Sequence, residues 1–205
     1  LDGGFGADTV SYAHAAVGLT VSLAVPGGNT GDAAADRYNS VENLTGTDFA
    51  DTLTGDGLPN RIEGLKGNDT LRGAGGNDFL LGGPGKDVLA GGPGGDIFRF
   101  DKRSDSPAGI GRDEITDLNV GEAGTFVDRI DLRPIDARID VVGDQAFRFI
   151  GGNAFTGISG QLRIRAAAPH SILSGDVNGD KTGDFEILLR NFANSANLTS
   201  LDFLR

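Results

Sequence analysis

The chain has 205 residues, of which 34 are glycine and none is cysteine, so disulfides and thiolate metal sites are excluded. Acidic residues outnumber basic residues by 29 to 18, which gives a net charge of −11 at pH 7. This charge argues against binding of nucleic acid or of anionic membranes and favours binding of cations, and no apolar run is long enough to span a membrane.

A nine-residue repeat dominates the first half of the chain. Each unit approximates G-G-x-G-x-D followed by a triplet with an apolar middle residue, and it occurs at residues 3–11 and then six times without a gap over residues 46–99. The sixth position is occupied by Asp8, Asp51, Asn60, Asp69, Asp78, Asp87 and Asp96. The eighth position is occupied by Val10, Leu53, Ile62, Leu71, Leu80, Leu89 and Phe98. Such a period indicates one structural unit stacked many times.

The unit itself predicts a turn followed by a short strand. Its first six residues are rich in glycine, which tolerates positive φ and close approach of the backbone. Its last three residues form a minimal strand that points one apolar side chain inward. Two units complete one coil, and stacked coils give two parallel sheets with the apolar side chains between them. The predicted fold class is therefore all-β, a parallel β-roll.

The recurring aspartates predict calcium sites between stacked turns. Stacking places Asp69 beside Asp87 at one edge of the roll and Asp78 beside Asp96 at the other. Carboxylates held this close repel each other unless a cation neutralises them. Together with the carbonyl oxygens of glycine-rich turns they form the hard-oxygen coordination that Ca²⁺ prefers and that suits Mg²⁺ less well. The alternative, solvated aspartates in a glycine-rich loop, is disfavoured by six units in register.

These nonapeptides resemble the repeats-in-toxin (RTX) family of calcium-binding β-rolls. The resemblance implies that one turn supplies the carbonyls of positions 1 and 3 together with its aspartate. The turn two units later then supplies the carbonyls of positions 2 and 4 together with its own aspartate. The implied ligands are Gly64, Lys66, Asp69, Gly83, Gly85 and Asp87 for one site, and Gly73, Gly75, Asp78, Gly92, Gly94 and Asp96 for the next. Asp8 and Asp51 are further candidate ligands.

Two units depart from the repeat pattern. The unit at residues 46–54 has Phe49 at the fourth position, and the unit at residues 55–63 has Leu58 there and Asn60 at the sixth. We therefore expect metal sites that use these two turns to be weak or empty.

Residues 12–45 interrupt the array of repeats. Residues 17–24 alternate apolar with small or polar side chains, which predicts a strand, and residues 26–32 predict a loop. Residues 40–46 return to the register of the repeat, with Glu42 at the sixth position and Leu44 at the eighth. We expect this last segment to form a metal-free coil that caps the roll.

Glycine becomes sparse after residue 100, and the strand-like patterns lengthen. Five segments alternate apolar with polar residues, as half-buried antiparallel strands do: 113–119, 127–132, 146–151, 160–166 and 185–190. We expect two parts, a β-roll over residues 1–100 and a C-terminal β-sandwich over residues 101–205 that covers the end of the roll.

One loop of the second half has the composition of a metal site. Its oxygen-bearing side chains alternate along the chain: Asp176, Asn178, Asp180, Thr182 and Asp184. This is the spacing of the first ligands of an EF-hand loop, but Lys181 replaces the usual glycine and Ile187 the usual bidentate glutamate. Both a short calcium loop and a hairpin turn without metal fit this pattern.

The second half is also similar to the C-terminal domain of serralysin-type secreted metalloproteases. The similarity rests on DIFRF (96–100), DEITDLN (113–119), DRIDLRPIDA (128–137), AFRFIGG (146–152), GDVNGDKTGDFEILL (175–189) and LDFL (201–204). It implies export by the type I secretion machinery, which reads the C-terminus. Asp202, Phe203 and Leu204 match the acidic-then-apolar ending of that family, whereas Arg205 does not. The similarity also implies calcium ligands after the last repeat, for which Asp113 and Asp117 are the candidates.

The sequence contains no catalytic constellation, because the H-E-x-x-H zinc motif of serralysins is absent and the two histidines are isolated. We expect a calcium-binding RTX module that drives calcium-dependent folding and type I secretion of a larger extracellular bacterial protein, of which this chain is a fragment. One alternative is a non-catalytic appendage of a secreted protease, lipase or polysaccharide-modifying enzyme. Another is a polysaccharide-binding adhesin domain, which the presence of only two tyrosines, Tyr12 and Tyr38, and no tryptophan makes less attractive.

Overall fold

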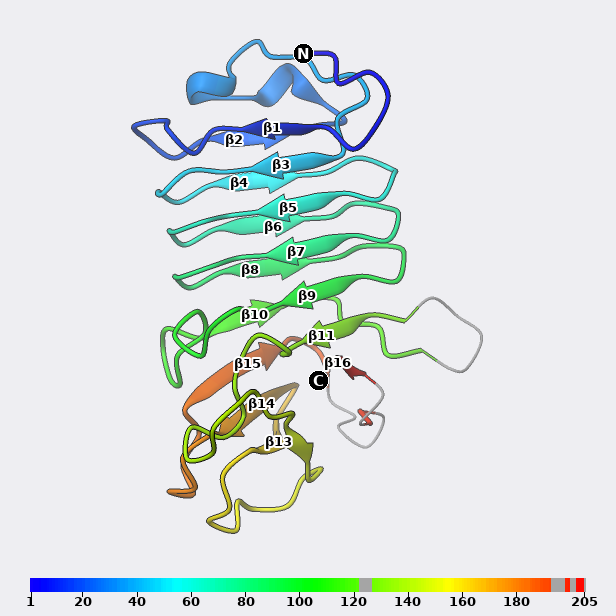
Figure 1. The fold of residues 1–205 in the computed structure, drawn as a ribbon. Coiled ribbons are helices and arrows are strands. Elements are labelled where there is room, and N and C mark those ends of the chain that lie inside the picture. The colour runs from blue at the N-terminus through cyan, green and yellow to red at the C-terminus, as the bar shows by residue number, and fades with distance from the viewer. Residues whose placement is uncertain (122–126, 193–197, 200–201, 205) are drawn as a thin grey trace.

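A computed structural model describes residues 1–121, 127–192, 198–199 and 202–204 of the chain. The regular secondary structure of the described part consists almost wholly of short strands, which stack into a tall roll and are joined by turns and loops (Figure 1). The strands of the roll are β1 (Thr9–Ser11), β2 (Thr20–Ser22), β3 (Asn43–Thr45), β4 (Thr52–Thr54), β5 (Arg61–Glu63), β6 (Thr70–Arg72), β7 (Phe79–Leu81), β8 (Val88–Ala90) and β9 (Ile97–Arg99). They are followed by β10 (Asp113–Ile115), β11 (Arg129–Asp131), β12 (Arg148–Phe149), β13 (Gln161–Ala167), β14 (His170–Asp176), β15 (Phe185–Leu189) and β16 (Phe203–Leu204).

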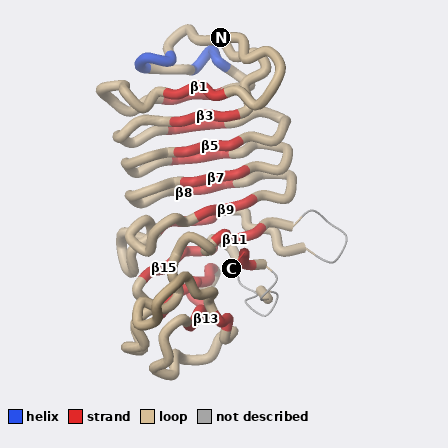
Figure 2. Tube along the Cα trace, in the orientation of Figure 1, coloured by secondary structure: helices blue, strands red, loops and turns tan. Residues whose placement is uncertain are grey.

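Alternate strands belong to alternate sheets, as the two-unit coil predicts. One sheet has the order β1-β3-β5-β7-β9-β11-β16, and the other has the order β12-β13-β14-β15-β10-β8-β6-β4-β2. Within the roll every pairing is parallel, and the partners follow the repeat, for example Leu53 with Leu71 and Leu71 with Leu89. Figure 2 shows the resulting ladder of short strands connected by turns at both edges. The prediction of an all-β parallel roll is confirmed.

The eighth position of each repeat forms the core between the two sheets. The side chains of Leu44, Leu53, Ile62, Leu71, Leu80, Leu89 and Phe98 are 0% exposed. Only one residue of each strand points inward, so each coil contributes two large apolar side chains and cannot form a core by itself. The stability of the roll therefore depends on stacking of its coils.

The segment that interrupts the array of repeats, residues 12–45, contains the predicted strand and the predicted coil in register, and it continues both sheets. It contributes β2, which pairs in parallel with β4, and β3, which pairs in parallel with both β1 and β5. The loop predicted at residues 26–32 contains two short 3₁₀ turns, η1 (Pro26–Gly28) and η2 (Gly31–Ala33). These turns lie over the N-terminal end of the roll in Figure 1, where they contact the edge strand β2.

The second half also differs from the prediction of antiparallel strands. The strands β10, β11, β12 and β16 all pair in parallel, and only β13, β14 and β15 form an antiparallel meander. Both roll sheets therefore run on across the predicted boundary at residue 100. Strand β14 was not predicted; nearly all of it is buried, so it lacks the alternating pattern of a half-buried strand.

Candidate metal centre

The turns of the roll align their sixth-position residues in two rows. The turns that precede the nine-stranded sheet bring together Asp51, Asp69, Asp87 and Asp113, which we call the first acidic row. The turns that precede the seven-stranded sheet bring together Asp8, Glu42, Asn60, Asp78, Asp96 and Asp128, which we call the second acidic row. Each row follows from strand register, since Thr70 pairs with Val88 and Phe79 pairs with Ile97.

One oxygen of each carboxylate bonds to the backbone of the preceding coil. In the first acidic row, Oδ1 of Asp69 accepts from the backbone N–H of Asp51, and Oδ1 of Asp87 from that of Asp69, both at 2.8 Å. In the second acidic row, Oδ1 of Asp96 accepts from the backbone N–H of Asp78, also at 2.8 Å. The sixth position thus links consecutive coils as well as carrying charge.

The second oxygen of these carboxylates is buried and has no partner. The orphaned oxygens are Oδ2 of Asp69, Asp78, Asp87, Asp96 and Asp113. All five residues are at most 2% exposed. A buried carboxylate oxygen without a partner carries a large desolvation cost. Such an oxygen is the natural ligand of a cation.

The first glycine of each turn makes room for this oxygen. A β-carbon placed on Gly64 would lie 2.4 Å from Oδ2 of Asp69 and 2.7 Å from the carbonyl oxygen of Gly82. On Gly73 it would lie 2.2 Å from Oδ2 of Asp78 and 2.5 Å from the carbonyl oxygen of Gly91. A carboxylate oxygen and a carbonyl oxygen therefore face the same small space, a donor set that suits Ca²⁺.

The environment of the rows raises the pKa of their carboxylic acids. Burial, together with the charges of Asp87 and Asp51, raises the pKa of Asp69 to about 7 against the opposing backbone hydrogen bond. Burial has the same effect on Asp78 and Asp87, whose pKa values are about 7. For Asp113, burial and the charge of Asp87 raise the pKa to about 9. Without a cation, the folded roll therefore favours the protonated acids.

We predict that acid partly replaces calcium. Because the folded pKa values near 7 exceed the unfolded value near 3.8, folding takes up protons between these limits. In calcium-free buffer, the contribution of these carboxylates to stability should be fully present below about pH 4 and be lost as the pH rises through about 7. Thermal unfolding followed by circular dichroism at about pH 5 and about pH 8 tests this. A higher melting temperature at the alkaline pH would contradict the prediction.

Asp51 and Asn60 differ from the other members of their rows. The hydroxyl of Thr47 donates to the Asp51 carboxylate, and the backbone N–H of Thr47 donates to its Oδ2 at 2.6 Å. The side-chain amide of Asn60 donates to the carbonyl oxygen of Glu42 at 3.3 Å. Neither side chain leaves an orphaned oxygen. Weak or empty metal sites in these two turns stay a prediction.

The rows end on residues outside the nonapeptides. Asp113, a predicted ligand, accepts from the backbone N–H of Asp87 at 2.8 Å, and the unpredicted Asp128 accepts in the same way from Asp96 at 2.9 Å. Asp117, also predicted, lies beside the second acidic row, where its carboxylate accepts from the N–H groups of Gly91 and Gly92. Asp105 is buried and has an orphaned Oδ1. Asp105 falls at the sixth position when the nine-residue count is continued past residue 99, and this is the signal by which it could be found. Asp128 does not fall at that position, so the sequence gives no such signal for it.

The predicted carbonyl ligands lie in the same stacked turns. A β-carbon on Gly83 would meet the carbonyl oxygen of Leu65 at 1.9 Å, and one on Gly92 that of Ala74 at 2.1 Å. The other glycines of the predicted sets, Gly75, Gly85 and Gly94, belong to these turns as well, as does Lys66. Asp8 has an orphaned Oδ2 at the N-terminal end of the second acidic row. Gly82 and Gly91, whose carbonyls face the carboxylates, were not in the predicted sets.

The loop at residues 176–184 is satisfied by its own hydrogen bonds. Asp176 accepts from the backbone N–H groups of Gly179 and Lys181, and Asp184 accepts from the N–H of Val177. Asn178 and Asp180 also bond within the loop. The segment is a hairpin turn between β14 and β15, remote in sequence from the acidic rows, and metal binding by it stays a prediction.

No cluster of three or more acidic or histidine side chains within the described residues could hold a metal by itself. Ion binding between the turns must therefore draw on backbone carbonyls as well as carboxylates. The described part of the chain also has no helix long and apolar enough to cross a membrane.

Comparisons with known proteins agree with this geometry. The family model for the RTX calcium-binding nonapeptide repeat (4 copies) matches residues 45–80 and 63–98. The solution structure of the AlgE6R2 subunit of the Azotobacter vinelandii mannuronan C5-epimerase is similar at a TM-score of 0.58 and 30% identity, over 80% of this chain and 92% of that one. The AlgE6R3 subunit of the same enzyme is similar at a TM-score of 0.54 and 30% identity, over 77% and 78%. No curated protein sequence matches the chain.

Proposed function

Because the chain belongs to the family of RTX calcium-binding nonapeptide-repeat modules, we propose that it is the part of an extracellular bacterial protein whose folding is driven by calcium. The chain is a non-catalytic repeat module, and its cofactor is calcium. The observation that carries the proposal is the set of buried carboxylate oxygens without partners in the two acidic rows.

The proposed ions lie between stacked turns of the same row. In the first acidic row, Asp69 and Asp87 would hold an ion together with carbonyls of residues 64–66 and 82–85. In the second acidic row, Asp78 and Asp96 would do so with carbonyls of residues 73–75 and 91–94. Bound calcium supplies the positive charge that the orphaned oxygens lack. Asp113 and Asp128 would extend the rows beyond the last repeat.

The charge of the chain explains why folding would depend on the ion. At neutral pH the roll must either protonate its buried carboxylates or leave them charged and uncompensated, and both cost stability. A net charge of −11 further opposes compaction. Extracellular calcium modules typically bind with Kd values of about 10⁻⁴ to 10⁻³ M, so millimolar calcium outside a cell would suffice. Where free calcium is scarce, the coils that carry the orphaned oxygens would stay unfolded.

An unfolded chain suits export through a narrow channel, and we propose the type I secretion machinery as the route. The support is the similarity of the second half to serralysin-type domains, including the ending Asp202-Phe203-Leu204. In the folded chain, Phe203 and Leu204 form β16, which pairs with β11. The export motif would therefore be accessible only before the roll folds.

A calcium titration of the whole chain tests the folding proposal. Followed by far-UV circular dichroism at about pH 7.5, the chelated chain should be largely disordered, and millimolar calcium should restore the β-sheet spectrum in a steep transition. Magnesium at the same concentration should not, because it demands compact octahedral coordination. A spectrum that is folded to the same extent with chelator would contradict the proposal.

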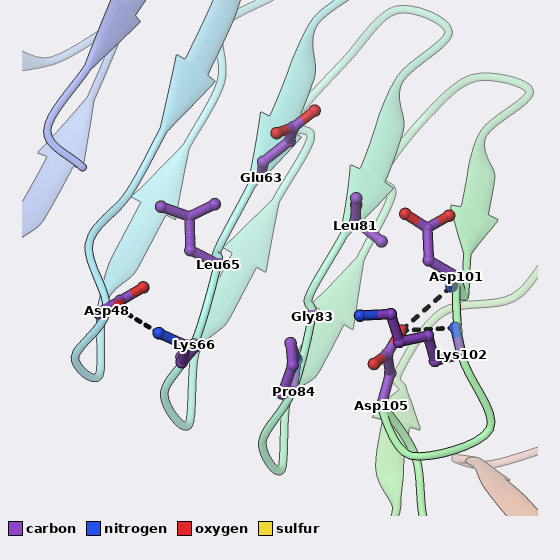
Figure 3. A pocket seen from close by; sticks show the side chains of 10 residues that line it. All are labelled: Asp48, Glu63, Leu65, Lys66, Leu81, Gly83, Pro84, Asp101, Lys102 and Asp105. Carbon is purple, nitrogen blue, oxygen red and sulfur yellow. Dashed lines mark hydrogen bonds and ion pairs between the residues drawn. The ribbon is translucent and has the colours of Figure 1, made fainter.

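A second candidate function is binding of an acidic polysaccharide, as an appendage of a polysaccharide-modifying enzyme. The similar subunits belong to an epimerase named for mannuronan. On the outer face of the seven-stranded sheet, the Arg61 guanidinium lies 4.2 Å from the ring centre of Phe79, and Arg99 lies 5.8 Å from it on the neighbouring strand. Beside them is a groove of about 260 Å³ that Lys66 and Lys102 line together with the carboxylates of Asp48, Glu63, Asp101 and Asp105 (Figure 3). Arg61 pairs with Glu63 and Arg99 with Asp101, so an acidic chain would have to displace these carboxylates.

The two tyrosines do not contribute to such a surface. The hydroxyl groups of Tyr12 and Tyr38 bond to each other at 2.7 Å, and Tyr12 also donates to Asp36. Both lie in the segment between β1 and β3, residues 12–42, which we call the N-terminal cap. Titration of acidic oligosaccharides into the wild type and into Arg61→Ala would decide whether the arginine face binds them.

A further inference from the structure

The acidic rows contain two kinds of turn that differ in what neutralises the sixth position. From residue 64 onward, the sixth-position aspartates Asp69, Asp78, Asp87 and Asp96 each leave a buried oxygen without a partner, as Asp8 does in the first turn of the chain. In the preceding coil, residues 46–63, neither sixth-position side chain does so. The difference coincides with the departures of this coil from the repeat pattern.

Thr47 occupies the second position of its turn and encloses the carboxylate of Asp51. Its hydroxyl lies 3.1 Å from both carboxylate oxygens, and its backbone N–H donates to Oδ2. The backbone N–H of Leu19 donates to Oδ1 at 2.8 Å. Both oxygens are therefore saturated by hydrogen-bond donors of the chain itself. Equivalent turns carry Leu65 and Gly83 at the second position, which have no hydroxyl.

Asn60 stands where the other turns of this row have a carboxylate. Its side-chain amide carries no charge and supplies a hydrogen-bond donor that a carboxylate lacks. Its Oδ1 accepts from the backbone N–H of Asp56 at 2.8 Å, and its Nδ2 donates to the carbonyl oxygen of Glu42. A side-chain amide has one acceptor and one donor group, so it can bridge two coils where a carboxylate would need a cation. The residue is 4% exposed, so water cannot take over this role.

The fourth positions of this coil support the same distinction. Gly67 and Gly76 must be glycine, because a β-carbon there would lie 2.6 Å from the backbone carbons of Phe49 and Leu58. Side chains can occupy the fourth position at Phe49 and Leu58, because the neighbouring layer on that side of the coil is the N-terminal cap and not another glycine-rich turn. The coil thus stacks on the cap on one side and on a glycine-rich turn on the other.

We propose that Thr47 and Asn60 stand in for calcium, so that residues 9–63 fold without the ion. The calcium-dependent coils from residue 64 onward then stack on this part of the chain. The N-terminal part has its own core, in which Leu19, Val21, Leu44, Leu53 and Ile62 are at most 3% exposed. The inference rests on the proposed function, because it assumes that the later coils need calcium. Asp51 is then a structural residue and not a metal ligand.

Amide hydrogen exchange of the whole chain, with chelator and with calcium, tests this inference. The reporters are four backbone amides that donate to the carbonyl oxygen of the neighbouring coil. In the first part, Thr52 donates to Leu19 and Arg61 donates to Glu42. In the second part, Val88 donates to Asp69 and Ile97 donates to Asp78. In chelator, the amides of Val88 and Ile97 should lose protection. Those of Thr52 and Arg61 should remain at least about tenfold slower than in an unfolded chain.

Two substitutions with matched controls sharpen the test. Thr47→Val removes the hydroxyl, and in chelator it should abolish the protection of Thr52, whereas Thr54→Val on the adjacent strand should not. Asn60→Asp should abolish the protection of Arg61 in chelator and restore it in calcium. Asn77→Asp adds the same charge at an exposed position of a turn in the same row and should leave the protection of Arg61 unchanged.

The outcomes separate the inference from the proposed function. Loss of protection at all four amides in chelator would overturn the inference and leave calcium-dependent folding intact. Retained protection at Val88 and Ile97 in chelator would contradict calcium-dependent folding itself. Unchanged exchange in Thr47→Val and Asn60→Asp would show that these side chains do not replace the ion.

Discussion

Substitution of Gly85 by alanine is expected to prevent stacking of the calcium-binding coils. A β-carbon on Gly85 would lie 1.5 Å from the carbonyl oxygen of Gly67 and 2.7 Å from its carbonyl carbon. Both are backbone atoms of the preceding coil, so no side-chain rotation relieves the overlap. Residues 82–87 would have to move away from residues 64–69, which breaks the Asp69–Asp87 bond and the core contacts of β8. We expect a loss of about 4 kcal/mol or more, among the largest effects of a single substitution.

The matched control is Gly57→Ala in the same array. A β-carbon on Gly57 meets no atom within 4 Å, and the residue does not have a left-handed backbone conformation. Its replacement should change stability by no more than about 1 kcal/mol, and it can even stabilise by restricting the unfolded chain. Thermal unfolding in saturating calcium measures both variants. Equal melting temperatures would show that the turns are not stacked as described.

Substitution of Asp87 by asparagine is expected to change stability in opposite directions with and without calcium. Asparagine keeps an acceptor for the backbone N–H of Asp69, and it removes the charge that burial disfavours. In chelator at about pH 8 the variant should therefore be more stable than the wild type, by up to about 4 kcal/mol for a pKa shift of about three units. In saturating calcium it should be less stable, because a charged ligand is lost.

The control for this variant is Asp48→Asn, which removes a charge from an exposed turn of the same edge. The Asp48 carboxylate is 50% exposed and pairs with Lys66, so its loss should cost less than about 1 kcal/mol in either condition. Urea unfolding of both variants with chelator and with calcium gives the four free energies required. If Asp87→Asn destabilises equally in both conditions, the role of Asp87 is structural and not tied to an ion.

The repeats determined which parts of the fold could be predicted. The nonapeptide period places strands β4 to β9 and the core residues between them, because each unit carries the same turn and the same apolar position. In the second half, alternation predicts a half-buried strand but not the direction of its partner, so the parallel pairing of β10 and β11 was missed. Strand β14 was missed because it is buried on both faces.

The same reasoning separates predictable from unpredictable site residues. Asp69, Asp78, Asp87 and Asp96 follow from periodicity alone. Asp128 joins the second acidic row 32 residues after Asp96, through a connection that has no repeat, so only the folded chain brings it there. The role of Thr47 could not be predicted either, because a hydroxyl at the second position becomes significant only when its distance to the carboxylate is known.

The central claim is that cations held between stacked turns neutralise the buried carboxylates of the roll. A crystal structure of the chain grown in millimolar calcium, with anomalous scattering to identify the ions, tests it most directly. The account predicts an ion about 2.3–2.6 Å from Oδ2 of Asp69, bridging to the coil of Asp87, and no ion at Asp51. A fully folded roll whose Asp69, Asp78, Asp87 and Asp96 oxygens contact no ion would contradict it.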